Sequence, residues 1–477
     1  MILWRRRRLV AAVALAAVAL VAFVAVPAYS AFDSIYSLAW GQDILHGRLP
    51  SFDAYRAPTQ HPLWVALTTV LALFGEDGSR LVVGVCVAGF VALVVGGFRL
   101  AEAIFGEVVA WVFALLLVSR LDYGFLAARG FIDVPFLALV VWAAALEAEK
   151  PQRGGAVWVL LAAAGLLRPE AWLLAGAYAV YLALVGRRLP RPAEVAWVVV
   201  PPAIWMGSDW LVTGDPMYSS NYTTRSALSL GRQVPIEQLP ERLLKFMNDL
   251  TKLPVLAAGV LGLVLAFRLL PWRRLVVPSF LLVFGIATFL ALSIRGFAVI
   301  NRYLVVSALA LTLFAAFTLG GFALLDGRAR RAWAAASAVV VLLGVGWTVS
   351  KFSAEHIRWE LQSRQVIHND MVRLLADPEV RRARACGPVT VPNHKLVPDI
   401  RYLLDASADE VLPRTRLPEY GRGHRGVAIY VTGRRMLQSP AYGPFDQLND
   451  SPLIQVPGDD FRLAASGRYL AAYVNCA

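Results

Sequence analysis

Long apolar segments, separated by short loops that carry arginine, follow one another through the first 350 residues of this chain. A helix of about twenty apolar residues is long enough to cross a lipid bilayer, and several of these segments approach that length. Across the chain, 58% of residues are hydrophobic and only 17% are charged, which excludes a soluble globular protein. We therefore expect an α-helical polytopic membrane protein.

The positions of the basic residues predict the orientation in the membrane. A net charge of +13 would suggest a nucleic-acid partner in a soluble chain, but here the arginines cluster beside apolar segments, so no nucleic acid is expected. Arg5 to Arg8 precede the first apolar segment, which places the N-terminus in the cytoplasm by the positive-inside rule. A signal peptide cleaved near Ala28 or Ala31 is the alternative interpretation of this first segment.

About eleven spans follow from this start if residues 62–74 do not cross, because about thirteen apolar residues are too few. The later spans are expected at 81–99, 107–119, 134–148, 155–167, 170–185, 194–212, 254–270, 275–294, 303–325 and 332–350. The cytoplasmic loops then hold Lys150, Arg153, Arg187, Arg188, Arg191, Arg268, Arg273, Arg274, Arg328, Arg330 and Arg331, as the positive-inside rule requires. We expect a bacterial cytoplasmic-membrane protein with a first outer loop at 28–80 and a long outer loop at 213–253.

Residues 351–477 differ in composition from the transmembrane domain predicted over 1–350. Pro, Gly, Arg and Asp recur, and β-like runs such as Gly387–Val391 and Gly426–Val431 are short. We expect a small extracytoplasmic α/β domain there, on a stalk helix near 354–376.

The three cysteines do not form a metal framework. Cys86 lies in an apolar span. Cys386 and Cys476 lie in the expected outer domain and can pair in an oxidising compartment. Two unpaired thiols are the alternative, because sequence alone does not place the Cα atoms within reach of each other.

The stretch from Ala31 to Trp64 is too polar to cross the bilayer and concentrates acids and aromatic residues at one membrane face. A helix is predicted over 33–45 with one side formed by Ile35, Leu38, Ala39, Gln42 and Leu45. That pattern is typical of a helix lying in the membrane interface. Asp33 lies in its first turn, and Asp133, at the start of the 134–148 span, should reach the same face.

Ionisable residues are nearly absent from the middles of the predicted spans, and exceptions such as Glu194 and Asp209 lie near span ends. A proton-coupled pump needs charges at mid-depth. In this chain the charges gather at the outer rim, where a lipid headgroup and a water-soluble acceptor can meet. That distribution favours a lipid-dependent transferase.

Several short motifs, placed at matching points of the predicted topology, resemble those of a known enzyme family. They are the acid after the first span, the following helix, the His-Pro-Leu-Trp entry at 61–64, the Asp-Val-Pro opening at 133–135 and the Gly-Leu-Leu-Arg-Pro-Glu corner at 165–170. Residues 1 to about 320 thereby resemble the GT-C glycosyltransferases that depend on polyprenyl phosphate. The comparable families are the protein O-mannosyltransferases, the lipid A aminoarabinose transferases and arabinofuranosyltransferase-like proteins, so the sugar is not specified.

The resemblance implies that Asp33 is the catalytic residue and that Asp133 and His61 match the family's later Asp and its basic residue before Pro. Many members have a second acidic residue beside the first, where this chain has Ser34. A metal site that uses such a pair is therefore not implied. A divalent metal stays an open alternative, because isolated acids do not specify a coordination geometry.

Sugar transfer from a polyprenyl phosphate needs a base for the acceptor hydroxyl, and a carboxylate at the dry edge of a membrane can have its pKa raised enough to serve. Asp33 is the candidate base, and an N-cap of the 34–45 helix is its alternative role. Asp133 is expected to orient the acceptor or His61, with a cap of the 134–148 helix, followed by Pro135, as its alternative.

The leaving phosphate needs fixed donors, and arginine forks provide them. Candidates at the outer rim are Arg56, Arg168, Arg295 and Arg302, with Tyr303 and His61 beside them; anchoring at lipid headgroups is the alternative role. Glu170, Tyr218 and Tyr222 are candidates for acceptor or lid contacts. The 213–253 loop can close over the donor and exclude water, or it can be a passive amphipathic connector.

The leading hypothesis is an inverting glycosyltransferase. It would move a hexosyl or pentosyl group from a polyprenyl-phosphate carrier to a hydroxyl of a cell-envelope glycan, lipid or protein. A flippase or transporter of lipid-linked sugars is the first alternative, and it requires a hydrophilic path between spans. A membrane anchor that displays residues 351–477 is the second.

Overall fold

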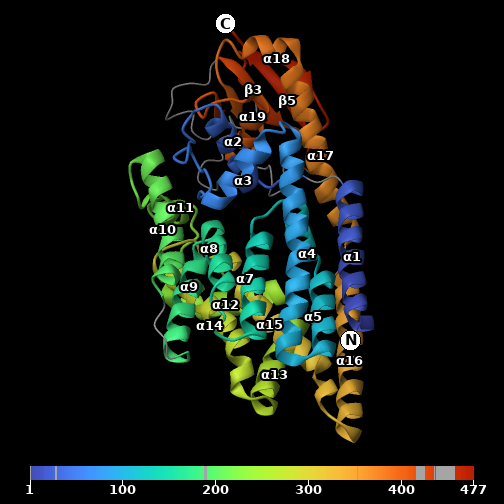
Figure 1. The fold of residues 1–477 in the computed structure, drawn as a ribbon. Helices are drawn as coiled ribbons and strands as arrows, with labels where there is room; N and C mark the ends of the chain where they lie inside the picture. The colour runs from blue at the N-terminus through green and yellow to red at the C-terminus, as the bar shows by residue number, and fades with distance from the viewer. Residues whose placement is uncertain are drawn as a thin grey trace. The chain divides into compact units, whose positions relative to one another are not determined.

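A computed structural model describes residues 2–26, 29–186, 191–351, 353–414, 425–433, 436 and 457–477 (Figure 1). Ala28, Arg187 and Arg188, which carry predictions above, lie outside these residues. The chain divides into two compact units. Unit 1 comprises Met1–Ala22, His61–Trp64 and Val85–Ser353; unit 2 comprises Phe23–Gln60, Val65–Gly84 and Ala354–Ala477. Unit 2 thus contains much of the first loop as well as the C-terminal residues.

Six helices of the described chain are long and apolar enough to cross a membrane, so the chain is a multi-pass membrane protein. They are α1 (Ile2–Ala25), α4 (Asp77–Phe105), α10 (Pro192–Thr213), α14 (Trp272–Ile294), α15 (Val305–Gly320) with its flanking turns, and α16 (Gly327–Lys351). Two bent pairs raise the number to eight if each pair is one span: α5 (Glu107–Ser119) with α6 (Leu121–Ala128), and α12 (Leu239–Thr251) with α13 (Leu253–Leu269). The expected count of about eleven is not confirmed.

Three of the expected spans are shorter helices. They are α7 (Asp133–Glu149), α8 (Ala156–Leu167) and α9 (Glu170–Leu184), with 17, 12 and 15 residues. α8 packs against α7, α9 and α10. Unit 1 also contains α11 (Tyr218–Ser229) and the 3-10 turns η1 (Ile236–Gln238), η2 (Asn301–Leu304) and η3 (Gly321–Leu324).

The helix α15 forms the core of unit 1. Its residues from Val305 to Thr318 are all buried, as expected for a helix that is apolar on every side. It packs against α5, α13 and α14. The approach of α13 is close because Gly262 faces α15, where a Cβ atom would overlap the carbonyl oxygen of Phe314. Small residues at such contacts are typical of packed helices in membranes.

Two helices of the first loop are confirmed. α3 (Pro62–Ala72) has 11 residues and is too short to span, as predicted for 62–74. α2 (Phe32–Leu45) matches the helix predicted over 33–45, but the one-sided burial expected for it is wrong. Every residue from Ser34 to Gly41 is buried, because α19 (Val397–Leu404) packs on α2 and Thr68 of α3 donates a hydrogen bond to the Ser37 carbonyl at 2.9 Å.

Unit 2 contains a five-stranded sheet in the order β2-β1-β3-β5-β4. The strands are β1 (Val389–Val391), β2 (Val411–Pro413), β3 (Gly426–Val431), β4 (Arg462–Ser466) and β5 (Leu470–Asn475). β1 runs parallel to β2 and β3, whereas β5 is antiparallel to β3 and β4. α17 (Ala354–Ala376) and α18 (Pro378–Ala383) pack against β5 (Figure 1), and η4 (His394–Leu396) precedes α19. The predicted small sheet domain near the C-terminus and the helix near 354–376 are confirmed, whereas the limits 351–477 for that domain stay a prediction.

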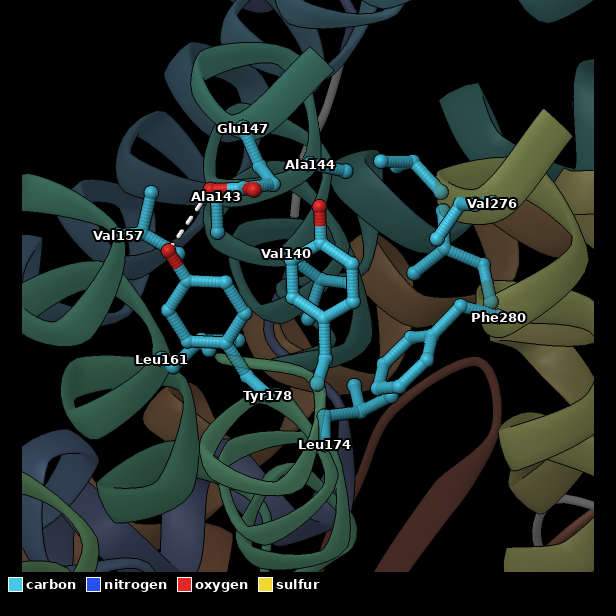
Figure 2. A pocket seen from close by; sticks show the side chains of 13 residues that line it. Val140, Ala143, Ala144, Glu147, Val157, Leu161, Leu174, Tyr178, Val276 and Phe280 are labelled. Carbon is cyan, nitrogen blue, oxygen red and sulfur yellow. Dashed lines mark hydrogen bonds between the residues drawn. The ribbon is translucent and has the colours of Figure 1, made fainter. Parts of the chain in front are cut away.

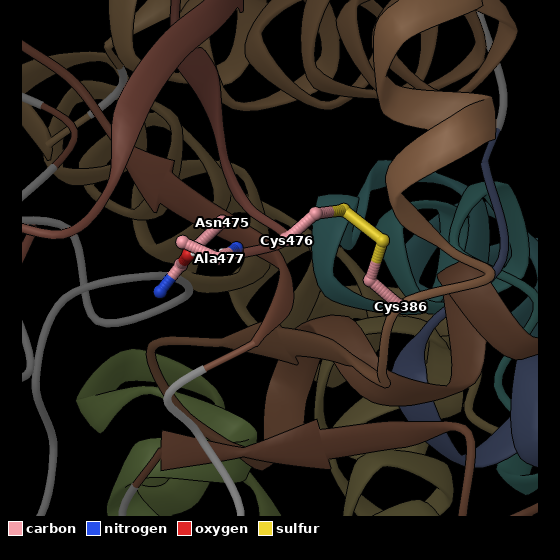
Figure 3. The surroundings of a disulfide bond; sticks show 4 residues. All are labelled: Cys386, Asn475, Cys476 and Ala477. Atoms are coloured by element: carbon pink, nitrogen blue, oxygen red, sulfur yellow. Dashed lines mark hydrogen bonds between the residues drawn. A yellow bond between two sulfur atoms is a disulfide. The ribbon is translucent and has the colours of Figure 1, made fainter.

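A disulfide joins Cys386, just before β1, to Cys476 at the end of β5, with Cα atoms 5.4 Å apart (Figure 3). Of the two alternatives left open by the sequence, the structure has the paired cysteines. Next to it, the side chain of Asn475 accepts a hydrogen bond from the backbone N–H of Ala477 at 3.0 Å (Figure 3). Cys86 is a buried free thiol.

Candidate functional site

Asp133 is the centre of a cluster of charged side chains in unit 1. It is the first residue of α7 and is only 1% exposed. Arg302, from η2, donates to one carboxylate oxygen from Nη2 at 2.7 Å and to the other from Nε at 3.2 Å. Arg168, from the corner between α8 and α9, donates to the same carboxylate. Three residues predicted for the site thus meet.

Glu170 joins the cluster through Arg168. Its Oε1 atom accepts hydrogen bonds from Arg168 Nε at 3.0 Å and Nη2 at 2.5 Å. Arg168 and Glu170 are both buried, at 5% and 8% exposure. Two arginines and two carboxylates balance in charge, which is what lets them persist at low dielectric, since removing one partner would leave a buried charge uncompensated.

His61 lies next to the arginines and is neutral. Burial, together with the charges of Arg168 and Arg302, lowers the pKa of His61 to about 3. Its ring packs edge-on against Trp205, with centroids 5.6 Å apart. His61 Nδ1 and Glu170 Oε2 are both buried without a hydrogen-bond partner in the described part of the chain. His61 therefore offers the cluster a hydrogen-bonding group and no positive charge.

The two arginines differ in exposure. The Arg302 side chain is 33% exposed and that of Arg168 is 6% exposed. Tyr303, beside Arg302, packs against a buried apolar cluster that includes Phe289 and Leu304. Arg295 is exposed at the C-terminal end of α14, and no described contact joins it to Asp133. Only Arg302 combines a direct bond to Asp133 with access to a ligand.

The 213–253 segment is folded into α11, η1 and α12. Tyr218 and Tyr222 stack on one side of α11, with ring centroids 5.5 Å apart and planes 17° apart. The helix is fastened to α10 by buried Asp209, which accepts hydrogen bonds from the backbone N–H and hydroxyl of Ser219 at 2.9 and 2.8 Å. These contacts hold the two tyrosines on an ordered helix.

The same segment is also bonded to the turn before Arg302. The Val299 N–H donates to the Arg232 carbonyl at 2.8 Å, and Gln233 donates to the Gly296 carbonyl at 2.5 Å. The segment and the 295–302 loop are therefore coupled.

Asp33 lies in unit 2, in the first turn of α2, and is half-buried. The helix begins at Phe32 after an N-cap at Ala31, so the alternative role of Asp33 as N-cap is wrong. The same holds for Asp133, because Ile132 is the N-cap of α7. A carboxylate in the first turn still interacts favourably with the helix dipole. Arg56, also in unit 2, lies over the ring of Tyr55 at 5.3 Å.

A buried ion pair in unit 2 was not predicted from the sequence. Arg401 of α19 donates to Asp43 of α2 at 3.0 Å, and its side chain is 1% exposed. Arg401 also donates to the Ser51 hydroxyl at 2.7 Å. The only sequence signal was an acid inside the apolar pattern of α2, whose partner is 358 residues away. The pair fixes α19 against α2.

A cavity of about 50 Å³ lies between α7, α8, α9 and α14 (Figure 2). Its lining is apolar except for Glu147, Tyr178 and Tyr181. Glu147 accepts hydrogen bonds from the Tyr178 hydroxyl at 2.7 Å and from the backbone N–H groups of Gln152 and Arg153 at 2.5 and 3.3 Å. The carboxylate thus closes the loop after α7, and the cavity suits hydrocarbon better than a sugar.

In the described part of the chain, no three His, Cys, Asp or Glu side chains come together in a way that could hold a metal ion. The charged cluster of unit 1 instead alternates carboxylates with guanidinium groups, which compete with a cation for the same oxygens.

Comparison with solved structures identifies the fold. The structure of ArnT from Cupriavidus metallidurans bound to undecaprenyl phosphate matches with a TM-score of 0.56 and 14% sequence identity, over 98% of both chains. The chain shares its fold with this ArnT. The apo state of the same ArnT matches over 97% of both chains, with a TM-score of 0.56 and 15% identity.

A weaker likeness is to the oligosaccharyltransferase of Archaeoglobus fulgidus in its apo form, with a TM-score of 0.47 and 11% identity, over 84% of this chain and 64% of that one. The sequence matches no protein-family model and no curated protein. The likeness in fold to ArnT is therefore not accompanied by overall sequence similarity.

Proposed function

We propose that this protein is a glycosyltransferase whose donor is a sugar carried on polyprenyl phosphate. The observation that carries the proposal is the match to ArnT bound to undecaprenyl phosphate, which extends over 98% of both chains. The cluster around Asp133 supports it, because it presents a partly exposed arginine at the end of an apolar helix bundle. A phosphate attached to a long hydrocarbon needs both features.

The transfer takes place on the outer face of the cytoplasmic membrane. The Cys386–Cys476 disulfide supports an extracytoplasmic unit 2, because such bonds persist in oxidising compartments. Arg5 to Arg8, at the N-terminal end of α1, support a cytoplasmic N-terminus. Asp33, in unit 2, then acts outside the cytoplasm.

Asp33 is the general base in this mechanism. It accepts the proton of the acceptor hydroxyl as that oxygen attacks the anomeric carbon of the donor. The bond between the anomeric carbon and the phosphate oxygen breaks, its electron pair stays with the phosphate, and the anomeric configuration inverts. Arg302 stabilises the charge that develops on the phosphate, while Asp133 and Arg168 hold Arg302 in place.

The deciding experiment is Asp33→Asn in the full-length protein, assayed with a radiolabelled polyprenyl-phosphate sugar. Transfer should fall at least about 100-fold while binding of the lipid carrier is kept. Asp459→Asn, at an exposed acid of unit 2, is the matched control and should transfer normally. Full activity of Asp33→Asn would remove Asp33 from the mechanism. Labelled lipid crossing vesicles without a new glycosidic bond would favour the transport alternative.

A further inference from the structure

Unit 2 contains a polar cavity of about 160 Å³ that no part of the mechanism uses. A cavity of about 150 Å³ accommodates one six-membered ring. Its walls come from α2, the loop after α2, α19 and β2. The side chains that matter below are Tyr36, Asp53, Tyr55, Arg401 and Asp409.

The rings at this cavity are held in place. Tyr36 is fully buried and packs against Phe32 and Trp40 of the same helix, with ring centroids 5.0 and 5.5 Å apart. Tyr55 is half-buried, with the guanidinium of Arg56 over its ring and the ring of His394 against it at 89°. Tyr36, at 0% exposure, therefore only backs the wall, whereas Tyr55 offers a preformed surface with little entropy to lose on binding.

The polar groups of the cavity are two carboxylates at its mouth and, in its wall, an arginine that already donates hydrogen bonds to other residues. Asp53 and Asp409 are exposed. Arg401 is buried, and its guanidinium already donates to Asp43, Ser51 and the Ala406 carbonyl. The charge of Arg401 is thus matched by Asp43, and the two carboxylates of the lining outnumber the one other cation beside it that is described above, Arg56 over the Tyr55 ring. A phosphorylated or otherwise anionic ligand is repelled at this mouth.

We propose that the cavity is a binding site for a neutral pyranose unit of the acceptor. Such a ring presents C–H faces to aromatic side chains and hydroxyl donors to carboxylates, and the cavity supplies both partners at the size of one ring. The proposal rests on the proposed function in one respect. Asp33 precedes Tyr36 by three residues on α2, so the cavity that Tyr36 lines lies on the helix face that carries the base.

Saturation-transfer NMR on the full-length protein in detergent tests the site without a donor substrate. The probes are methyl α-mannopyranoside and methyl α-glucopyranoside, with mannose 6-phosphate and glucose 6-phosphate as anionic counterparts. At least one glycoside should bind, and its phosphate should bind about tenfold more weakly, as two carboxylates a few ångströms away predict. Asp53→Asn with Asp409→Asn should reduce that difference, while Asp459→Asn should not.

Tyr55→Ala should abolish glycoside binding and raise the acceptor KM in a transfer assay with little change in kcat. Three outcomes would each overturn the site. They are that neither glycoside binds, that the sugar phosphates bind as tightly as the glycosides, or that Tyr55→Ala leaves glycoside binding unchanged. Asp409→Asn, at an exposed residue, is the second variant to be measured if Tyr55→Ala does not fold. Asp33→Asn separates the two proposals. If this variant still binds the glycoside but no longer transfers sugar, both proposals are supported. If it binds the glycoside and transfers sugar normally, Asp33 is not the base, and the pyranose site still stands.

Discussion

Arg302 donates two hydrogen bonds to the two carboxylate oxygens of Asp133, across 169 residues of sequence. This pairing fixes the start of α7 to the turn that precedes α15, and Arg168 extends it to the corner between α8 and α9. Bidentate pairs of arginine and carboxylate set orientation as well as distance. The position of the one partly exposed arginine is therefore determined by buried neighbours.

Replacing Asp133 by Ala should destabilise the protein by about 3–5 kcal/mol, because it leaves Arg168 buried without a full set of counter-charges. The midpoint of thermal unfolding in detergent measures this loss. The triple variant Asp133→Ala, Arg168→Met and Glu170→Gln should recover part of it, since the buried arginine is then removed together with both of its carboxylate partners. An unchanged midpoint in Asp133→Ala would contradict the coupling described here.

Tyr218→Ala with Tyr222→Ala should increase the fraction of donor lost to hydrolysis relative to transfer, if α11 helps to exclude water from the donor. The ratio of free sugar to glycosylated acceptor is the measurement. Because Asp209 and Ser219 still fasten the helix, its position should persist. Phe at both positions is the matched control and should keep the original ratio.

The stability of unit 2 should fall as pH rises from about 4 to 7. Burial raises the pKa of Asp399 to about 7, although Arg364 and a hydrogen bond from Tyr29 lower it. Because the folded value exceeds the ordinary value of 3.8, the contribution is fully present below pH 3.8 and is lost as pH rises through 7. The slope is at most about 1.4 kcal/mol per pH unit. Asp399→Asn should flatten it in thermal unfolding from pH 5 to 8, whereas Asp460→Asn should not.

Thiol counting tests the disulfide. The denatured, non-reduced chain should react with one maleimide, at Cys86, and the reduced chain with three. Replacing Cys386 and Cys476 by Ser should cost about 4 kcal/mol of stability, because the bond closes a loop over a separation of 90 residues. Three reactive thiols before reduction would contradict the pairing.

Features that depend on local sequence were predictable. The helix α17 and the strands β1 and β3 fall where composition and β-propensity placed them, and α3 is as short as its apolar run. The span count was not predictable, because α7, α8 and α9 are apolar helices too short to cross by length alone. Hydropathy does not distinguish such helices from true spans.

The other features that the sequence did not predict depend on residues far apart in the chain. The predicted topology placed Asp133, Arg168 and Arg302 on the same face of the membrane. Both arginines were expected to bind a phosphate, and their pairing with Asp133 and Glu170 was not predicted. The burial of α2 on all sides likewise comes from α19, more than 350 residues away, for which α2 carries no local signal.

The chain enters unit 2 at Phe23, leaves it for His61–Trp64, re-enters it until Gly84 and returns only after Ser353. A gene fusion that joined a finished outer domain to a finished membrane protein would not produce this connectivity. A chain that ended after Ser353 would lack α19, which packs on α2, and Arg401, which pairs with Asp43. The early part of unit 2 therefore completes its core only after the last part of the chain has been synthesised.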